Sequence, residues 1–187
     1  MYIRSKRRAT ALALVLALAA GAPQARDQSA ADPLAQARAA HAKRDYLVAF
    51  RLLLPLARGG DAEAQLRLGL MYHYGQGVRE DDTEAFRWFQ RAAQQGDAEA
   101  QFRLASLYAL GLGVPAAEAE PDRTAASWYF RAASQGHAEA QHTLGILFLT
   151  GKGVVQSQSE ALTWFRRAAA NGHPEAQRFV EAHPAPR

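Results

Sequence analysis

The chain has 187 residues, 49% of them hydrophobic, which is enough for one domain with a sizeable core. It carries 22 Lys and Arg against 18 Asp and Glu, but four of the basic residues lie in the first 25 positions, which contain no acid. The other 18 basic residues balance the 18 acidic ones, so the chain lacks the basic surface with which nucleic-acid-binding proteins neutralise phosphates. The absence of cysteine excludes a disulfide scaffold, a thiolate zinc site and a cysteine nucleophile.

The start of the chain has the composition of an export signal. Basic residues precede an apolar run over residues 10–20, and mostly small residues follow at 21–25. This is the order of regions in a secretory signal, and the run is shorter than the about 20 apolar residues of a membrane-spanning helix. We therefore expect a cleavable signal peptide over residues 1–25, with an uncleaved anchor as the alternative. The mature protein is then periplasmic or secreted, meets the membrane only during export, and begins with a flexible lead-in at residues 26–32.

The rest of the chain is dominated by an internal repeat. Segments that open on G-[DH]-A-E-A-Q and close on R-A-A-x-x-G recur at spacings of 36, 40 and 36 residues. We name them unit 1 (60–95), unit 2 (96–135, with a longer loop) and unit 3 (136–171). A fourth segment, 172–187, begins in the same way and supplies a capping helix and a tail, and residues 33–59 form a diverged leading helix pair. Repeats of this length are typical of stacked supersecondary units.

Each unit predicts two helices joined by a glycine-containing turn. In unit 1 the first helix follows Asp61, a favourable N-cap, and carries an apolar stripe of Ala64, Leu68 and Tyr72 at helical spacing. A pair of glycines then ends it, the first of which, Gly75, suits the left-handed position after a helix. The second helix has its own apolar stripe, formed by Ala85, Trp88, Phe89, Ala92 and Ala93. Two helices of this length cannot bury both stripes alone, so we expect the core to form between stacked units.

The flanking segments are also expected to be helical. In the leading pair the pattern predicts helices over residues 34–43 and 46–57, and Pro55 is expected to bend or shorten the second. The closing helix is predicted over residues 174–182 because Pro174 suits a first helical position. The tail, residues 183–187, is expected to fray.

The repeated pattern A-E-A-Q-x-x-L-G-x-x-Y-x-x-G-x-G-V, followed by E-A-x-x-W-F-x-R-A-A-x-x-G, resembles the Sel1-like repeat. The resemblance covers residues 60–172, and more loosely 33–182. It implies an all-α fold, a right-handed α/α superhelical solenoid related to tetratricopeptide repeats. It also implies an adaptor role in which the protein holds another protein or peptide. Some secreted relatives are linked to penicillin binding, but those are rich in cysteine and this chain has none.

By analogy with tetratricopeptide repeats, the first helix of each unit would line a concave groove. This inner row is fairly apolar and suits a partner helix or an extended peptide. It consists of Leu66, Leu70, His73, Phe102, Ser106, Ala109, His142, Ile146 and Leu149.

Unit 2 departs from its neighbours at two further positions. Phe130 stands where the other units have Gln90 and Arg166, so we expect an exposed aromatic ring. Leu112 lies between the two turn glycines, and the long loop over residues 115–122 belongs to the same unit. Exposed aromatic residues are enriched at binding sites. We therefore expect a second contact region here, with sequence drift as the alternative.

No sequence motif predicts a catalytic residue, a metal or a cofactor. HExxH, a nucleophile elbow and a phosphate loop are all absent, and the glycine pairs follow a helix rather than precede one. The repeated glutamates fall in first helical turns, where the helix dipole stabilises a negative charge. They are Glu63, Glu99, Glu139 and Glu175.

The three repeated tryptophans fit a structural role better than a sugar-stacking one, because each precedes core alanines at a fixed spacing. They are Trp88, Trp128 and Trp164. The sequence therefore predicts a non-enzymatic adaptor of the bacterial cell envelope. The alternatives are a small hydrolase of a β-lactam or cell-wall amide, and a structural subunit that stacks on copies of itself.

Overall fold

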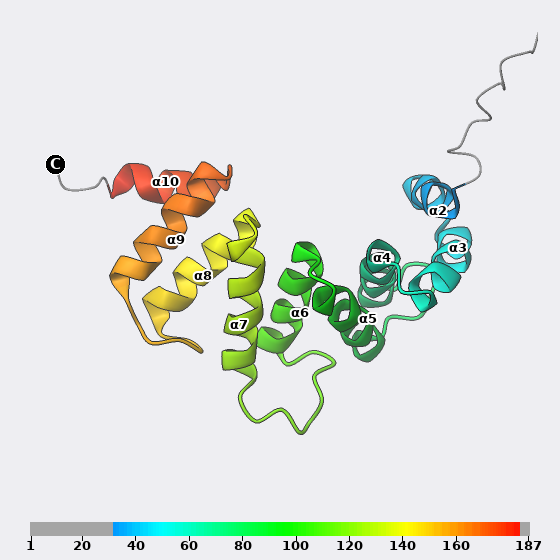
Figure 1. Ribbon diagram of the computed structural model, residues 1–187, viewed down its shortest axis with the longest axis horizontal. Helices are drawn as coiled ribbons and strands as arrows, with labels where there is room; N and C mark the ends of the chain where they lie inside the picture. Colours follow the sequence, from blue (N-terminus) through cyan, green and yellow to red (C-terminus); the bar gives the residue numbers. More distant parts are fainter. Residues whose placement is uncertain (1–31, 184–187) are drawn as a thin grey trace, which may run out of the picture.

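The computed structural model describes residues 32–183, and within that part of the chain all regular structure is helical (Figure 1). The helices are α2 (Pro33–Ala42), α3 (Tyr46–Arg58), α4 (Ala62–His73), α5 (Asp82–Gln94), α6 (Ala98–Leu110), α7 (Pro121–Ser134), α8 (Ala138–Thr150), α9 (Gln158–Ala170) and α10 (Pro174–Ala182). None of these helices is long and apolar enough to cross a membrane. The expected signal peptide, nearly all of the lead-in and the last four residues lie outside the described range.

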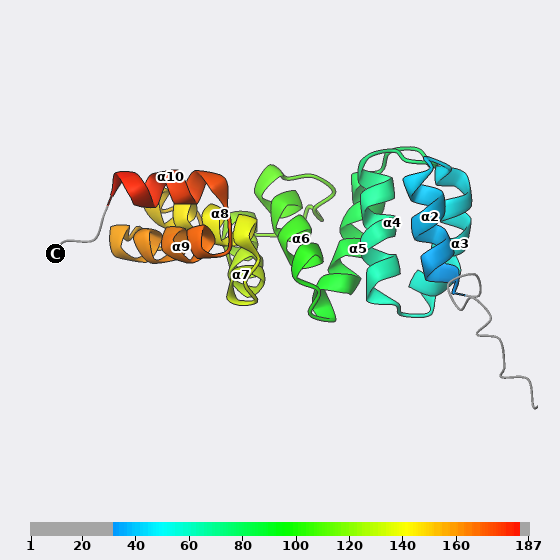
Figure 2. The same ribbon diagram turned by 90° about the horizontal axis from the view of Figure 1, so that it is seen from above.

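The helices form a solenoid of antiparallel hairpins. Each helix packs on the next in the chain, within a unit and across the junction to the following unit. The hairpins follow an open arc with α2 at one end and α10 at the other (Figure 1). In the perpendicular view the helix axes turn progressively from α2–α5 to α9 and α10, which is the twist of a superhelix (Figure 2). The expected α/α superhelical solenoid is confirmed.

The helix starts follow the predicted caps. The Asp61 carboxylate accepts a hydrogen bond from the Ala64 N–H at 2.7 Å, and Asp97 caps α6 in the same way. In unit 3 His137 takes over this role, because its Nδ1 accepts from the Ala140 N–H at 3.1 Å. Each cap satisfies a backbone donor that has no partner inside its helix.

Pro55 was expected to bend or shorten the second leading helix, and the expected shortening is wrong. Helix α3 continues past it to Arg58. A proline near a helix end removes a single backbone donor. Burial of Ala49, Leu53 and Ala57 along one side of α3 holds the helix through that point.

The core lies between units, as expected. One cluster of buried side chains runs from Ala85 in unit 1 to Trp164 in unit 3 without a break at the junctions. Trp88 and Trp164 are buried, and Trp128 packs against the same cluster while partly exposed. The tryptophans are therefore structural.

The second glycine of each turn allows a close approach between neighbouring units. Gly113 has φ +62°, and a Cβ there would lie 2.1 Å from the Asp82 carbonyl oxygen in the preceding unit. At the next junction, a Cβ on Gly153 would lie 2.2 Å from the Asp122 carbonyl oxygen. Each turn thus packs directly on the backbone at the start of the preceding unit's second helix, where only glycine fits.

Candidate interaction surfaces

The inner row remains at least partly exposed along the three units. None of its nine members is fully buried, and Ile146, with 42% of its surface exposed, is among the large exposed apolar residues. Leu66, Leu70 and Ala109 pack with one side against the core and leave the other side accessible. The structure thus gives the predicted row an accessible apolar portion.

Part of the inner row is already engaged inside the solenoid. The Phe102 ring stacks on His137 of unit 3 with centroids 4.8 Å apart. The Tyr129 hydroxyl donates to Ser106 Oγ at 3.1 Å, and that hydroxyl in turn donates to the Phe102 carbonyl. The Phe102–His137 contact joins units 2 and 3, and the Tyr129–Ser106 bond joins the two helices of unit 2, so these side chains are poor candidates for direct ligand contact.

A repeated buried glutamine links three helices at each junction. The Gln101 amide donates to the Ala93 carbonyl at 3.1 Å and accepts from the Gln135 amide at 2.8 Å. Gln65 and Gln141 make the same two contacts in units 1 and 3. This role was not predicted from the sequence, although the Q repeated in every A-E-A-Q motif, at a position that is buried, was a signal for it.

The repeated glutamates also act across junctions. Glu99 accepts from Arg103 in its own helix at 2.6 Å and contacts His137 Nε2 of the next unit at 2.9 Å. The hydrogen bond from His137, supported by the Arg103 guanidinium, lowers the pKa of Glu99 to about 2. These contacts add a cross-unit role to the helix-dipole role expected from the sequence.

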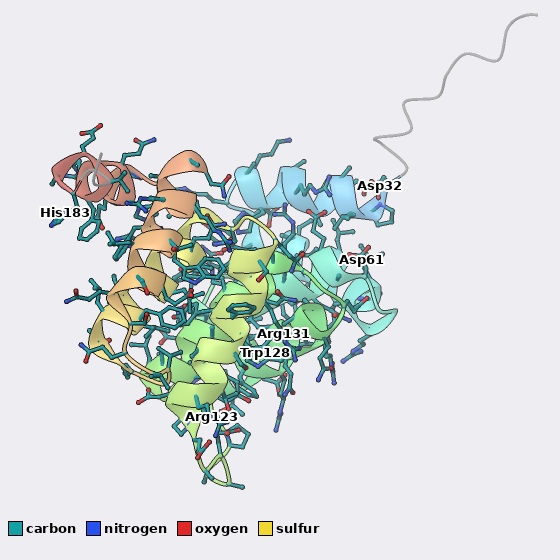
Figure 3. All side chains as sticks on the ribbon, turned by 60° about the vertical axis from the view of Figure 1, so that its left-hand side comes forward. Asp32, Asp61, Arg123, Trp128, Arg131 and His183 are labelled. Atoms are coloured by element: carbon teal, nitrogen blue, oxygen red, sulfur yellow. The ribbon has the colours of Figure 1, made fainter. Side chains whose placement is uncertain are left out.

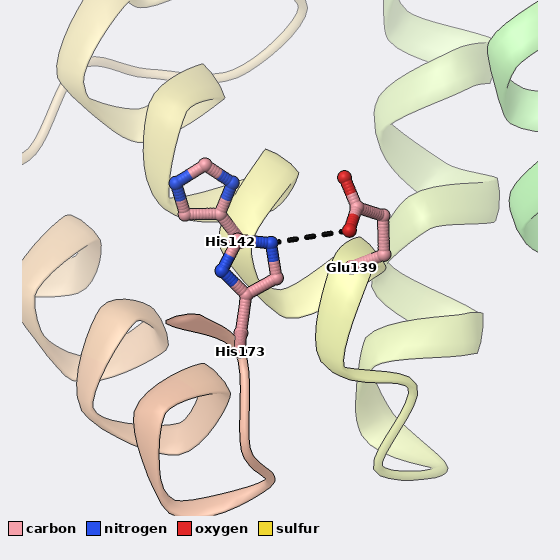
Figure 4. Close-up of side chains that lie close together, drawn as sticks. All are labelled: Glu139, His142 and His173. Carbon is pink, nitrogen blue, oxygen red and sulfur yellow. Dashed lines mark hydrogen bonds and ion pairs between the residues drawn. The ribbon is translucent and has the colours of Figure 1, made fainter. Parts of the chain in front are cut away.

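The junction between unit 3 and the closing helix α10 brings Glu139, His142 and His173 together, with atoms that could bind a metal within 4.8 Å of one another (Figure 4). Such a set could hold a metal ion only if each ring offered a lone pair to a common point. His173 does not, because its Nδ1 accepts from the Ala176 N–H at 3.2 Å and its Nε2 therefore carries the proton that faces Glu139.

Ring geometry leads to the same conclusion. The His142 and His173 rings are stacked at 4.1 Å with planes 15° apart, so their in-plane lone pairs do not converge. Burial, reinforced by the neighbouring His173, lowers the pKa of His142. The same contact recurs one unit earlier, where Phe102 stands in place of His142. The cluster is therefore the ring contact of this repeat position, with His142 in place of a phenylalanine. Its donor geometry does not fit a metal ion.

One pair resembles part of a hydrolytic site. His73 Nδ1 lies 2.6 Å from Asp82 Oδ1, as in a base held by an orienting carboxylate. Within residues 32–183, no serine or threonine hydroxyl hydrogen-bonds to His73. The pair therefore joins the end of α4 to the start of α5 and provides no nucleophile for the hydrolase alternative.

Each repeated tryptophan carries an arginine over its ring. The guanidinium carbon lies 4.4–4.5 Å from the ring centroid in all three units. The pairs are Arg91 over Trp88, Arg131 over Trp128 and Arg167 over Trp164. Because one face of each indole is covered and the rest packs on the core, none offers a free platform for a sugar ring.

The second predicted region lies at the unit 2–3 junction. Phe130 is 50% exposed, as expected, and lines a cleft of about 390 Å³ between α7, α8 and the turn after α8. Arg123, Trp128 and Arg131 follow one another along α7 (Figure 3), and the two arginines line the cleft. Leu112 is 36% exposed but does not line the cleft, so the structure separates it from Phe130. The end of the long loop borders an adjoining hollow through Glu120 and its neighbours.

Comparison with known proteins identifies the repeat. The Sel1 repeat model matches residues 62–97, 98–137 and 138–173. A Sel1 repeat protein from Oxalobacter formigenes is 32% identical with a TM-score of 0.73, and the match covers 80% of this chain and 60% of that one.

Two other solved structures are similar. The protein c5321, a protective antigen present in uropathogenic Escherichia coli strains displaying an SLR fold, is 25% identical with a TM-score of 0.73, over 83% of this chain and 34% of that one. The cysteine rich protein B of Helicobacter pylori is 20% identical with a TM-score of 0.53, over 78% and 95%, and shares the fold alone. The chain thus spans less than two thirds of the first two structures. A search of curated proteins finds no match.

Proposed function

Because the chain belongs to the Sel1 repeat family, we propose that it is a non-enzymatic adaptor of the bacterial cell envelope that binds a partner protein or peptide on the solenoid surface. Proteins of this family are generally protein-interaction scaffolds. The envelope location rests on the basic-apolar-small order of residues 1–25. No cofactor or metal enters the proposed activity.

One observation carries the proposal. The core side chains and the buried polar groups make contacts between the units, whereas the first helices keep apolar side chains accessible along the inner row. These are Leu66 and Leu70 on α4, Ala109 on α6, and Ile146 and Leu149 on α8. A row of this kind matches the way an amphipathic helix or an extended peptide is bound in a groove.

The test is capture of a partner by cross-linking, with the full chain carrying a C-terminal tag as bait in the envelope fraction. Ile146→Glu places a charge on the inner row at a position that makes few core contacts. Thr163→Glu is the matched control, because it adds the same charge to an exposed position on α9. We expect a partner captured by the wild type and by Thr163→Glu and lost with Ile146→Glu. Equal capture by all three baits would contradict binding on the inner row.

The envelope location has its own test. Cell fractionation should place the chain in the periplasm or the medium, and mass spectrometry should find a mature N-terminus near residue 26. A full-length chain in the cytoplasmic fraction would reject this part of the proposal. Light scattering tests the self-stacking alternative. We expect a monomer, and an oligomer that grows with concentration would favour self-stacking.

A further inference from the structure

The cleft at the unit 2–3 junction exists because one side chain is small. In unit 1, Phe86 is buried against Tyr108 of unit 2, with their ring centroids 5.2 Å apart. The residue two positions before the repeated tryptophan is Phe86 in unit 1 but Ala126 in unit 2. Phe148 takes the place of Tyr108 in unit 3 and lines the cleft instead of meeting a ring. The equivalent space is therefore filled at the unit 1–2 junction and open at the unit 2–3 junction.

Two further changes in unit 2 favour binding in this cleft. Phe130 replaces Gln90 and presents a half-exposed aromatic side chain at the rim, with its ring centroid 5.5 Å from that of Trp164 in an edge-to-face arrangement. Ser127 replaces Arg87 and puts a short side chain at that position of the rim. The walls are otherwise apolar, with Leu144 and Val154 completing them. A cleft of about 390 Å³ is at the lower end of the range of about 300–1,000 Å³ for ligand pockets, so it suits one bulky side chain with its immediate neighbours.

The charges at the rim are positive. Arg123 and Arg131 line the cleft, and no acidic side chain among residues 32–183 does. Arg131 is held over Trp128 at 4.4 Å and forms no ion pair with any residue in 32–183, so its guanidinium donors remain available. Arg123 pairs with Glu120 at 3.2 Å, but both side chains are well exposed and such a pair exchanges readily for another carboxylate.

We propose that this junction cleft binds a segment of a partner protein that carries one bulky apolar side chain beside an acidic residue. The apolar side chain enters the space that Phe86 fills at the preceding junction, and the acidic group pairs with Arg131. Aromatic and arginine side chains are the residues that most often dominate binding energy at interfaces. The proposal rests on the adaptor function and assigns its partner a chemistry.

Fluorescence anisotropy with the full chain and a labelled peptide tests the proposal. The probe has a central phenylalanine flanked by glutamates; one comparison peptide has alanine in place of phenylalanine, and another has lysines in place of the glutamates. We expect the probe to bind with a Kd of about 10–100 μM and both comparison peptides to bind at least about tenfold more weakly. Equal binding of the three peptides, or no binding of the probe, would overturn the proposal.

The decisive variant is Ala126→Phe, which restores the residue of unit 1. Because Phe86 occupies the equivalent place, this variant should fold with an unchanged or higher Tm and lose probe binding by at least about tenfold. Thr163→Phe, which adds the same ring on the exposed side of α9, is the control and should bind as the wild type does. If Ala126→Phe unfolds, Phe130→Gln tests the cleft instead, because it introduces the residue that unit 1 has at this exposed position. Arg131→Gln tests the pairing with the acidic group and should weaken probe binding about three- to tenfold.

The outcomes separate the cleft from the adaptor function. A partner captured from the envelope by both the wild type and Ala126→Phe would leave the adaptor standing and reject the cleft. Probe binding that Ala126→Phe abolishes, without any envelope partner, would support the cleft and reject the envelope role. A wild-type dimer that Ala126→Phe converts to a monomer would show that a second copy occupies the cleft, and would overturn the proposal.

Discussion

The two junctions of the repeat array share a backbone arrangement and differ in their side chains. Between units 1 and 2, as between units 2 and 3, a turn glycine packs on the preceding helix and a buried glutamine joins three helices. Phe86 closes the first junction, whereas Ala126 leaves the second open. The polar contacts therefore fix how units stack, while the size of one apolar side chain decides whether the junction is core or cleft.

The helix pairs of the units show a matching difference. In unit 1 the Phe89 ring lies so close to Gly69 that a Cβ there would be 2.5 Å from it. Unit 2 has Ala105 at that position with Tyr129 facing it, and the tyrosine hydroxyl bonds Ser106. Unit 2 thus carries both an added methyl group and an added hydroxyl group between its two helices.

The largest effect is expected from opening the closed junction. Phe86→Ala should lower the free energy of unfolding by about 3–5 kcal/mol, because a buried ring is lost and a cavity remains. Urea unfolding followed by circular dichroism measures it. Leu162→Ala, at the equivalent but partly exposed position of unit 3, should cost less. Equal costs would contradict the view that Phe86 fills a junction.

Loss of the buried amide should affect both junctions alike. Gln101→Ala removes two hydrogen bonds, one to the Ala93 carbonyl and one from the Gln135 amide, which should cost about 1–3 kcal/mol. Gln141→Ala should cost about the same, although its junction is open. A clearly smaller cost for one of the two in urea unfolding would show that the polar links are not equivalent.

The close contact between Gly69 and the Phe89 ring predicts that unit 1 does not tolerate the methyl group that unit 2 carries at Ala105. Gly69→Ala should destabilise by about 1–3 kcal/mol, because the new Cβ meets the Phe89 ring. Gly69→Ala combined with Phe89→Tyr tests whether the unit 2 pair is transferable. The shift of the thermal midpoint measures both, and a stabilised single variant would mean that helix propensity outweighs the contact.

The smallest effect concerns acid stability. The folded-state pKa of Glu99 is about 2, below its ordinary 4.5, so its carboxylate stabilises the fold fully above pH 4.5 and loses that contribution as the pH falls toward 2. Since the side chain is 37% exposed, the contribution is about 1 kcal/mol after solvent screening. Glu99→Gln should therefore narrow the stability difference between pH 6 and pH 3. An unchanged dependence of the thermal midpoint on pH would show that Glu99 does not contribute to acid stability.

Local rules predicted most of the fold. Asp61 and the turn glycines predict helix ends from backbone chemistry alone. The exposure of Phe130 was predicted because the other units have polar residues at its position. Contacts between units were beyond those rules, because the roles of Gln101 and Glu99 depend on which helix lies opposite. Ser106 looked available for a ligand until the structure placed Tyr129 against it. The change from Phe86 to Ala126 was visible in the sequence, but its consequence required the geometry of the junction.

The central claim is that the solenoid surface binds an envelope protein, and one capture experiment tests it most directly. Wild-type, Ile146→Glu and Ala126→Phe full-length chains are cross-linked in the envelope fraction and their captured proteins compared. We expect the wild type to capture a partner, and at least one of the two variants to lose that partner while remaining folded. Capture of no partner by the wild type would contradict it, and identical capture by all three folded chains would contradict binding at the inner row and the cleft.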